Sequence, residues 1–283
     1  MRSSTLNTSE VVVAIARKEV TDRLRNRWVW TVSALLFLCT VVIALFGAAP
    51  VGVVGGKGAG AVMASLMNLV AYLVPLIALI LGCGAIIDEK QRGTLDLILV
   101  YPLSPRAYFA GTFLGFALAL ALAVVVGLVL SGLFLVLWVG VPAIEYLILT
   151  LLALALGAAF LALSFLVSLL SRERGRAIAS SVFLWIFAVF VFDLILVGIL
   201  VASGGKLPAT LFGALLLANP SDCFRLLCFQ WLPSAAAPLG LAAVAPAGLP
   251  AWLLLAILTL WVAVPAAASY ALFQYRVDRD ALV

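Results

Sequence analysis

The stretch 86-IIDEKQRGTLDLILVYPLSP-105 separates two long apolar segments of this chain. Within nine positions it gathers five charged residues, Asp88, Glu89, Lys90, Arg92 and Asp96. Charged side chains are costly in the hydrocarbon core of a membrane, so they gather where the chain returns to water. The stretch therefore predicts a water-exposed connection between two membrane-spanning segments.

The composition of the whole chain points the same way. Of its 283 residues, 66% are hydrophobic and only 10% are charged, whereas a soluble domain carries about 25% charged residues. So few charges cannot cover a surface that faces water. The hydrophobicity is nearly continuous rather than alternating, which excludes an outer-membrane barrel. We therefore predict an all-α polytopic membrane protein.

Six segments are long and apolar enough to cross a bilayer, which takes about 20 residues. They cover residues 28–47, 63–87, 108–138, 144–170, 177–201 and 250–275, so a transmembrane domain is predicted over 28–275. The segment 202–249 is rich in proline and too broken to form a span. Short interfacial or re-entrant helices are expected there. Residues 276–283 are predicted to form a short tail.

The basic residues predict the orientation of these spans. Of the 17 Lys and Arg residues, only Lys57, Lys206 and Arg225 lie on one side of the predicted membrane, and the other 14 lie on the opposite side. By the positive-inside rule, both termini and the connection 88–106 are cytoplasmic, and 202–249 lies outside. The net charge of +5 follows from this topology, so no nucleic-acid partner is expected.

Residues 1–27 precede the first span and contain an amphipathic pattern. Val13, Ala16, Val20, Leu24 and Trp28 recur at spacings of three and four, and the charges fall on the remaining face. We expect a helix that lies flat on the cytoplasmic membrane surface, its basic side toward anionic headgroups. Two interpretations stay open: a simple anchor before the first span, or an elbow helix that moves with a partner.

The sequence offers little for catalysis or metal binding. It contains no histidine, which removes the commonest transition-metal ligand and the usual general base. Soft ligands that suit Cu(I) come only from the pairs Met63 with Met67 and Cys223 with Cys228, which are weak candidates beside their ordinary role in a membrane core. We predict no catalytic, cofactor or metal site in this chain.

One acid falls inside a predicted span. Asp193 lies in the segment 177–201, where a carboxylate near the bilayer centre costs about 2.5–3.5 kcal/mol on insertion scales. It must therefore face a partner or a watery cavity. Two roles remain open: a structural hydrogen bond within the bundle or at a dimer interface, and the lining of a pathway.

The connection 88–106 is more than a solvated loop. Its acids are followed by Gly93, by an apolar block over 95–100 and by two prolines that stop a helix. An apolar block is costly to leave in water. A polar return from the membrane with an apolar strip suits the docking of a soluble partner, so we expect one or two short interfacial helices that bind such a partner.

The run from Glu89 to Ser104 resembles the E-x-x-x-G-T-L-x-x-L-L-x-x-P-x-S signature of ABC-2 type transporter permeases. The resemblance implies a homodimer of six-span chains with type V exporter-like architecture in the bacterial inner membrane, bound to a separate cytoplasmic ATPase that holds ATP and Mg. It implies that 88–106 forms the coupling helix, through Glu89, Arg92, Gly93, Thr94, Leu95, Asp96, Leu99 and Pro102. The lead 16-ARKEVTDRLRNRW-28 is similar to the elbow helix of the family, which implies a role for Arg17, Lys18, Glu19 and Arg23.

A narrower resemblance comes from 218-ANPSDCFRLL-227 together with residues 86–115, which look like the permease subunit of the Nos transporter of denitrifying bacteria. That family works with a cytoplasmic ATPase and a periplasmic β-helical protein in maturing the copper–sulfur centre of nitrous oxide reductase. The resemblance implies that Asn219, Pro220, Asp222 and Arg225 contact the periplasmic partner. Export of a copper or sulfur species and mechanical transmission without cargo both remain open. A general exporter of lipid, drug or polysaccharide and a scaffold without transport are the alternatives.

Overall fold

A computed structural model describes residues 8–46, 58–91, 93, 104–204, 206, 208–236 and 249–280 of the chain. All regular elements within these ranges are helices, of which η2 and η3 are π-helical. In chain order they are α1 (Thr8–Arg25), α2 (Trp28–Phe46), α3 (Ala59–Gly82), α4 (Ile87–Gln91), α6 (Pro105–Phe134), η2 (Leu135–Val139), α7 (Ala143–Leu170), α8 (Arg174–Ile186), η3 (Phe187–Val191), α9 (Phe192–Ala202), α10 (Ala209–Leu216), α11 (Pro220–Trp231), α12 (Pro233–Ala236) and α13 (Ala251–Asp280).

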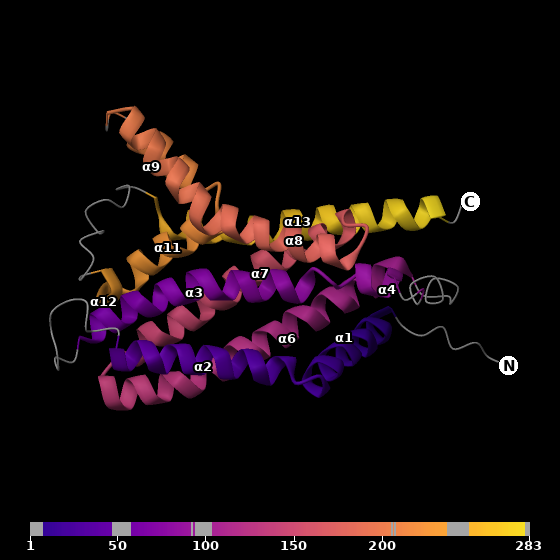
Figure 1. Cartoon of the computed structure of the whole chain (residues 1–283), viewed down its shortest axis with the longest axis horizontal. Coiled ribbons are helices and arrows are strands. Elements are labelled where there is room, and N and C mark those ends of the chain that lie inside the picture. The colour runs from indigo at the N-terminus through magenta and orange to yellow at the C-terminus, as the bar shows by residue number, and fades with distance from the viewer. Residues whose placement is uncertain are drawn as a thin grey trace.

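Six helical stretches in the described part are long and apolar enough to cross a membrane, which confirms the predicted fold class. They are Trp28–Phe46, Ala59–Gln91, Pro105–Val139, Ala143–Leu170, Arg174–Ala202 and Ala251–Val277. The start of α1 and the end of α13 lie at the same end of the bundle (Figure 1), as an even number of crossings requires. We call this the terminal end, and the other the far end.

The proline-rich segment forms short helices at the far end. Helices α10 and α11 meet at an angle of 115°, and α12 follows beside the start of α3 (Figure 1). The expected short helices are confirmed. Helix α11 packs against α7 and α13, and Pro220 suits the first position of this helix.

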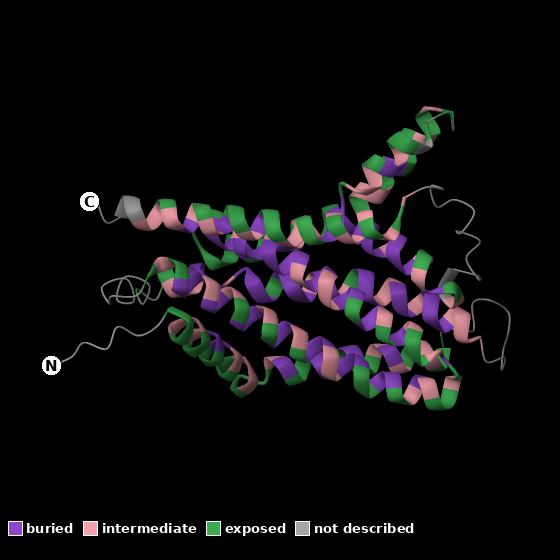
Figure 2. Cartoon of the chain, turned by 180° about the vertical axis from the view of Figure 1, so that it is seen from behind, coloured by how far each residue is buried: buried purple, intermediate pink, exposed green. Residues whose placement is uncertain are grey.

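Helix α7 forms the centre of the bundle because it packs against both α3 and α13. Its large side chains Phe160 and Phe165 are fully buried, and the buried residues follow the facing sides of the central helices (Figure 2). The stretch α8–η3–α9 and helix α13 are less covered. Only 17% of the most apolar window of each is buried, and α9 leans away from the other helices (Figure 1).

A row of small residues on α6 brings two helices close to it. From Gly111 to Gly127 every fourth residue is Gly or Ala, and this row faces α1 and α2. A Cβ atom built on Gly115 would stand 2.9 Å from the carbonyl oxygen of Ala16. Ser33 of α2 donates a hydrogen bond to the carbonyl oxygen of Ala123 over 2.9 Å. Small residues thus allow backbone-to-backbone packing, as in other membrane helix pairs.

The elbow helix exists, and most of its predicted apolar face turns inward: Ala16 is buried, and Leu24 and Trp28 pack against the core. Val13 is 64% exposed, whereas Glu19 is only 8% exposed and lies against α6. Arg23 also turns inward, with its guanidinium 3.5 Å from the centre of the Phe116 ring. The prediction placed all charges on the remaining face, whereas Glu19 and Arg23 turn toward α6. The glycine row fixes which face of α1 fits against α6, and a cation–π contact stabilises the inward arginine.

The corner between α1 and α2 is short and tight. Arg27 adopts a left-handed backbone conformation with φ +58°, which costs a non-glycine residue about 1–2 kcal/mol. The backbone N–H of Arg27 donates to the carbonyl oxygen of Leu24 (3.2 Å), and Thr31 Oγ1 donates to that of Arg27 (3.0 Å). These bonds fix the angle between the elbow helix and the first span.

Candidate functional site

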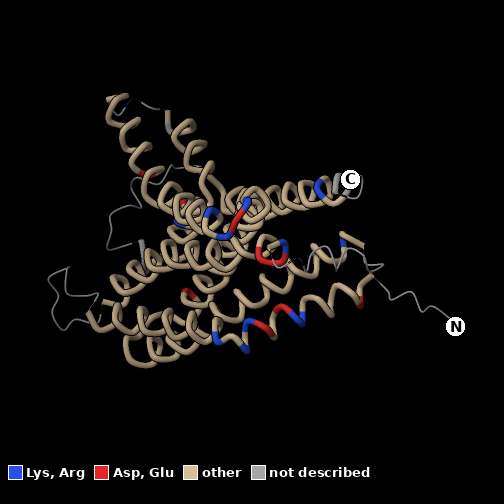
Figure 3. Tube along the Cα trace, turned by 45° about the vertical axis from the view of Figure 1, so that its right-hand side comes forward, with Lys and Arg blue, Asp and Glu red and all other residues tan. Residues whose placement is uncertain are grey.

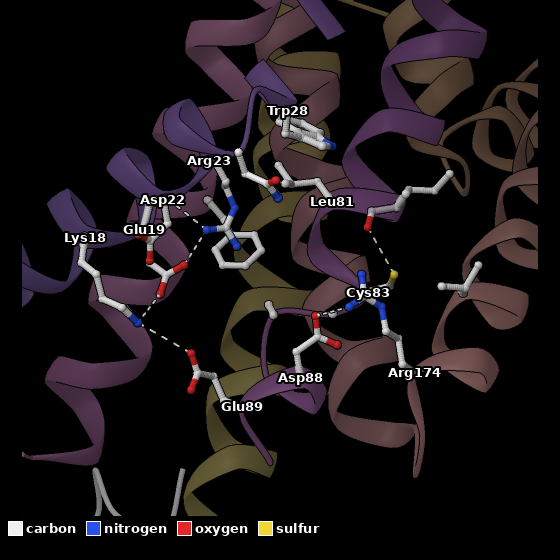
Figure 4. Close-up of a pocket in the computed structure, with 16 residues that line it drawn as sticks. Lys18, Glu19, Asp22, Arg23, Trp28, Leu81, Cys83, Asp88, Glu89 and Arg174 are labelled. Carbon is white, nitrogen blue, oxygen red and sulfur yellow. Dashed lines mark hydrogen bonds and ion pairs between the residues drawn. The ribbon is translucent and has the colours of Figure 1, made fainter. Parts of the chain in front are cut away.

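Charged side chains from three separate segments meet at the terminal end. Helix α1 provides Lys18, Glu19 and Arg23, α4 provides Asp88 and Glu89, and α8 begins with Arg174. We call this group the junction. Figure 4 shows the charged residues of α1 on one side of a cavity, with Asp88 and Arg174 on the other.

The position of α4 in the junction is set by its first backbone N–H groups. Ser168 Oγ, near the end of α7, accepts hydrogen bonds from the N–H groups of Ile86 (3.0 Å) and Ile87 (3.1 Å). The start of a helix has no intrahelical partners for these groups. Asp88 and Glu89 then occupy the first turn, where negative charge is favoured. The end of the second span is thereby tied to the end of the fourth.

Ion pairs connect the three segments. Lys18 Nζ lies 3.6 Å from Glu89 Oε1 and 3.4 Å from Glu19 Oε1. Glu19 also pairs with Arg23, at 2.5 Å. The side chains of Lys18 and Arg174 are more than half exposed, so their pairs contribute about 0–1 kcal/mol each. They orient the segments more than they stabilise them.

A second pair in the junction involves the fifth span. Arg174 Nη1 lies 3.0 Å from Asp88 Oδ2, so the acid that opens α4 holds the first residue of α8. Asp88 lies close beneath Gly84, where an added Cβ would be 2.7 Å from Oδ2. The glycine therefore leaves room for the carboxylate at this position.

The structure describes only part of the predicted coupling segment. Glu89 belongs to the junction, and Gly93 has φ +68°, a left-handed conformation that favours glycine. The other predicted coupling residues, Arg92, Thr94, Leu95, Asp96, Leu99 and Pro102, lie outside the described residues. Of the predicted elbow residues, Arg17 is exposed, while Lys18, Glu19 and Arg23 take part in the junction.

A second ionic group lies toward the far end and contains the partner of Asp193. Arg225 Nη1 of α11 lies 2.5 Å from Asp193 Oδ2 and 3.1 Å from Asp222 Oδ1. The same guanidinium lies 5.6 Å from the centre of the Tyr72 ring. Together with Asn219, these three charged residues form what we call the far cluster. Arg225, which belongs to the proline-rich segment 202–249, pairs with the acid of the fifth span.

Asn219 explains how the fifth span accommodates its π-helical segment η3. A π-helical turn disrupts the regular hydrogen-bond ladder of the helix. Asn219 Nδ2 donates to the carbonyl oxygen of Ala188 within η3 over 2.6 Å, and its Oδ1 accepts from the N–H of Ser221 (3.0 Å) at the start of α11. One side chain thus joins the irregular part of the span to α11.

The far cluster is directed into the chain. Asn219 and Asp222 are 2% and 3% exposed, and Pro220 is also buried. Their observed contacts are with the fifth span and within α11. The contact of these residues with a periplasmic partner stays a prediction. In this chain they hold α11 against the fifth span.

The weak metal candidates are packed in the core. Met63 and Met67 on α3 are at most 1% exposed, and Cys223 and Cys228 on α11 are fully buried. All four cysteines are free thiols. Among the described residues, no group of three or more Cys, Asp and Glu side chains could hold a metal ion.

Further bonds fasten the far-end helices to the other spans. Glu145 at the start of α7 accepts hydrogen bonds from Ser234 N (3.2 Å) and Ser234 Oγ (2.8 Å), and Trp261 Nε1 of α13 donates to the carbonyl oxygen of Leu217 (3.2 Å). Helix α12 is therefore fastened to the fourth span and the end of α10 to the sixth, while the far cluster connects α11 with the fifth.

One span links the two ionic groups. The stretch Arg174–Ala202 carries Arg174 at its first residue, paired with Asp88, and Asp193 farther along, paired with Arg225. In Figure 3 most of the trace carries no charge, and the charged residues gather in a few places. The stretch α8–η3–α9 thus contacts α4 at its start and α11 farther along.

Comparison with known proteins agrees with this architecture. Residues 13–277 match the family model described as ABC-2 family transporter protein. The chain is 42% identical over 276 residues to a protein of Pseudomonas aeruginosa named "Probable ABC transporter permease protein NosY", covering 94% of this chain and 98% of the relative. A protein of the same name from Stutzerimonas stutzeri is 38% identical over 270 residues, covering 93% and 97%. The chain therefore belongs to the ABC-2 family of transporter permeases.

Proposed function

We propose that this chain is the membrane subunit of an ATP-driven complex that passes the movement of a separate ATPase to a periplasmic partner, in the assembly of the copper–sulfur site of nitrous oxide reductase. The names of the two relatives and the Nos-like residues 86–115 and 218–227 support this branch. The complex would contain two copies of this chain in the bacterial inner membrane. ATP and Mg would be bound by the ATPase.

The observation that carries the proposal is the double attachment of the fifth span. At the terminal end Arg174 pairs with Asp88, the first residue of the predicted docking segment 88–106. Farther along the span Asp193 pairs with Arg225 on α11. A helical stretch attached at these two residues would pass on a tilt or rotation without needing a conduit, provided that each attachment has two arrangements.

The mechanism follows from these attachments. Closure of the ATPase dimer would press on the connection 88–106 and shift α4. Because Asp88 holds Arg174 and Glu89 lies near Lys18, the fifth span and the elbow helix would move with it. The far cluster would then reposition α11 relative to the fourth and sixth spans. Different ATPase contacts in the two states supply the free-energy difference.

Transmission without cargo is favoured over a copper conduit. Cu(I) prefers soft sulfur ligands, and a conduit needs several of them in succession. The described Met and Cys candidates are instead packed in the hydrophobic core. A general exporter of lipid, drug or polysaccharide and a scaffold without transport are the competing functions.

Reconstitution separates these functions. We expect liposomes that contain this chain and its ATPase to hydrolyse ATP without moving copper or sulfide, while intact cells need ATP turnover to mature the copper site. If copper or sulfide crossed the membrane in an ATP-dependent way, the chain would be a transporter and the transmission hypothesis would be wrong. Maturation that continues with a hydrolysis-deficient ATPase would instead support the scaffold.

The junction provides a charge-exchange test. We expect Arg174→Asp to reduce copper-site maturation strongly but stability by only about 1 kcal/mol or less, because the Arg174 side chain is 59% exposed. The double variant Asp88→Arg/Arg174→Asp should recover part of the lost maturation, because the opposite charges face each other again. Arg172→Asp, a few residues before and outside the junction, serves as the matched control. Equal loss in the single, double and control variants would contradict coupling through this pair.

A further inference from the structure

The cavity within the junction has the lining of an amphipathic ligand site. It has a volume of about 460 Å³, within the range of about 300–1,000 Å³ that is usual for small-molecule pockets. Its charged lining consists of three cations and four carboxylates, namely Lys18, Arg23, Arg174, Glu19, Asp22, Asp88 and Glu89. The remaining walls are largely apolar, with Trp28, Leu81 and Phe116 among them.

The cavity also lies at the height where a membrane ends. Trp28 is the first residue of the first span, and tryptophan is typical of the membrane–water interface. Ile80 and Ile178 line the cavity from the second and fifth spans and are 43% and 39% exposed. Exposed isoleucines on spans face lipid or a neighbouring apolar surface. The cavity therefore joins charged groups at the cytoplasmic side with apolar surface at the depth of acyl chains.

The charges select among lipid headgroups. The lining residues carry one net negative charge, so a purely anionic headgroup is not favoured. Lys18 and Arg174, whose side chains are 55% and 59% exposed, have donors available for a phosphate. Asp22 is exposed on the same cavity and offers acceptors. This arrangement matches a zwitterionic headgroup: a lysine or arginine donor suits its phosphate, and the Asp22 carboxylate suits an ammonium group that donates hydrogen bonds.

We propose that the cavity between the elbow helix and the starts of α4 and α8 binds a phospholipid of the inner leaflet with a primary-ammonium headgroup, phosphatidylethanolamine. The phosphate binds Lys18, and the ammonium donates to Asp22, which lies four residues farther along the same helix and also lines the cavity. The acyl chains pass between Ile80 and Ile178. This proposal does not depend on the proposed function, because it concerns only the lipid held by this chain.

Phosphatidylcholine provides the discriminating comparison, because its trimethylammonium group cannot donate a hydrogen bond. The full-length chain is placed in nanodiscs with equal amounts of phosphatidylethanolamine, phosphatidylcholine and phosphatidylglycerol, and retained lipids are counted by native mass spectrometry. We expect about tenfold preference for phosphatidylethanolamine over phosphatidylcholine, the ratio produced by one charge-assisted hydrogen bond. Equal retention of the two, or preference for phosphatidylglycerol, would overturn the proposal without any variant.

A matched pair of variants locates the site. Asp22→Asn removes the negative charge of the proposed ammonium acceptor and leaves only a neutral amide oxygen, and Glu10→Gln removes one negative charge from the first turn of the same helix, outside the cavity. The ratio of retained phosphatidylethanolamine to phosphatidylcholine should fall close to one in Asp22→Asn and stay at about ten in Glu10→Gln. Loss in both variants, or in neither, would refute the assignment to this cavity. Soluble phosphoethanolamine is added in a separate arm, and if it binds as well as the lipid, the ligand is a free metabolite and the lipid proposal fails.

Discussion

Arg225→Leu should be the most damaging single substitution in the described part of this chain. The substitution leaves Asp193 and Asp222 without the cation that they share. Helix α11 contains no second cation that could replace Arg225. Removing one partner of a buried ion pair costs about 3–5 kcal/mol. Because 36% of the Asp193 side chain is exposed, we expect about 3 kcal/mol. The midpoint of thermal unfolding in detergent, followed by loss of monodisperse protein, measures the effect.

Two further variants separate charge from packing at the far cluster. Asp193→Asn/Asp222→Asn/Arg225→Met removes all three charges and should recover most of the lost stability, because no unpaired charge remains. Arg176→Leu is the matched control: Arg176 pairs with Glu173, but both side chains are more than half exposed, and the cost should stay below about 1 kcal/mol. If the triple variant were as unstable as Arg225→Leu, unpaired charge would not be the reason.

Gly115→Leu should separate the elbow helix from the third span. A Cβ at this position would lie 2.9 Å from the carbonyl oxygen and 3.1 Å from the Cα atom of Ala16. These are backbone atoms, so no rotamer change of a neighbour relieves the overlap. Overpacking of this kind costs about 1–3 kcal/mol. We also expect loss of the Lys18–Glu89 contact, because α1 carries Lys18 with it.

Accessibility of α1 reports the separation directly. Ala16 is 7% exposed, so a cysteine introduced there should react slowly with a maleimide in the parent protein and quickly when Gly115→Leu is added. Gly198→Leu is the control, since a Cβ at Gly198 has no atom within 4 Å. Slow labelling of position 16 in Gly115→Leu would show that α1 tolerates the larger side chain.

The spans were predictable because each depends on local composition alone. A stretch of about 20 apolar residues forms a helix across a membrane whatever surrounds it, since every backbone group must be bonded within the segment. The six predicted spans agree with Trp28–Phe46, Ala59–Gln91 and the four later stretches to within a few residues. The proline-rich segment was predictable for the opposite reason, because it offered no such uninterrupted stretch.

The inward turn of two charged residues of α1 and the partner of Asp193 were not predictable in the same way. Apolar spacing identified the buried Ala16, but the row of small residues on α6 also accepts Glu19 beside it. The repeat of Gly and Ala at every fourth position of α6 was the available signal. For Asp193, the sequence required a partner but could not choose Arg225, which lies 32 residues away beyond a sharp bend.

The sequence by itself determined that this chain is a six-span membrane protein with a charged connection after the second span, and its motif indicated the permease family. These properties follow from local hydrophobicity, charge counts and one short motif. Only the tertiary structure decided that Asp88 meets Arg174 and Asp193 meets Arg225, so that one span connects two ionic groups. Such pairs depend on the rotation of each helix and on the bend between α10 and α11. Packing between distant segments sets both, and it produces no periodic pattern in the sequence.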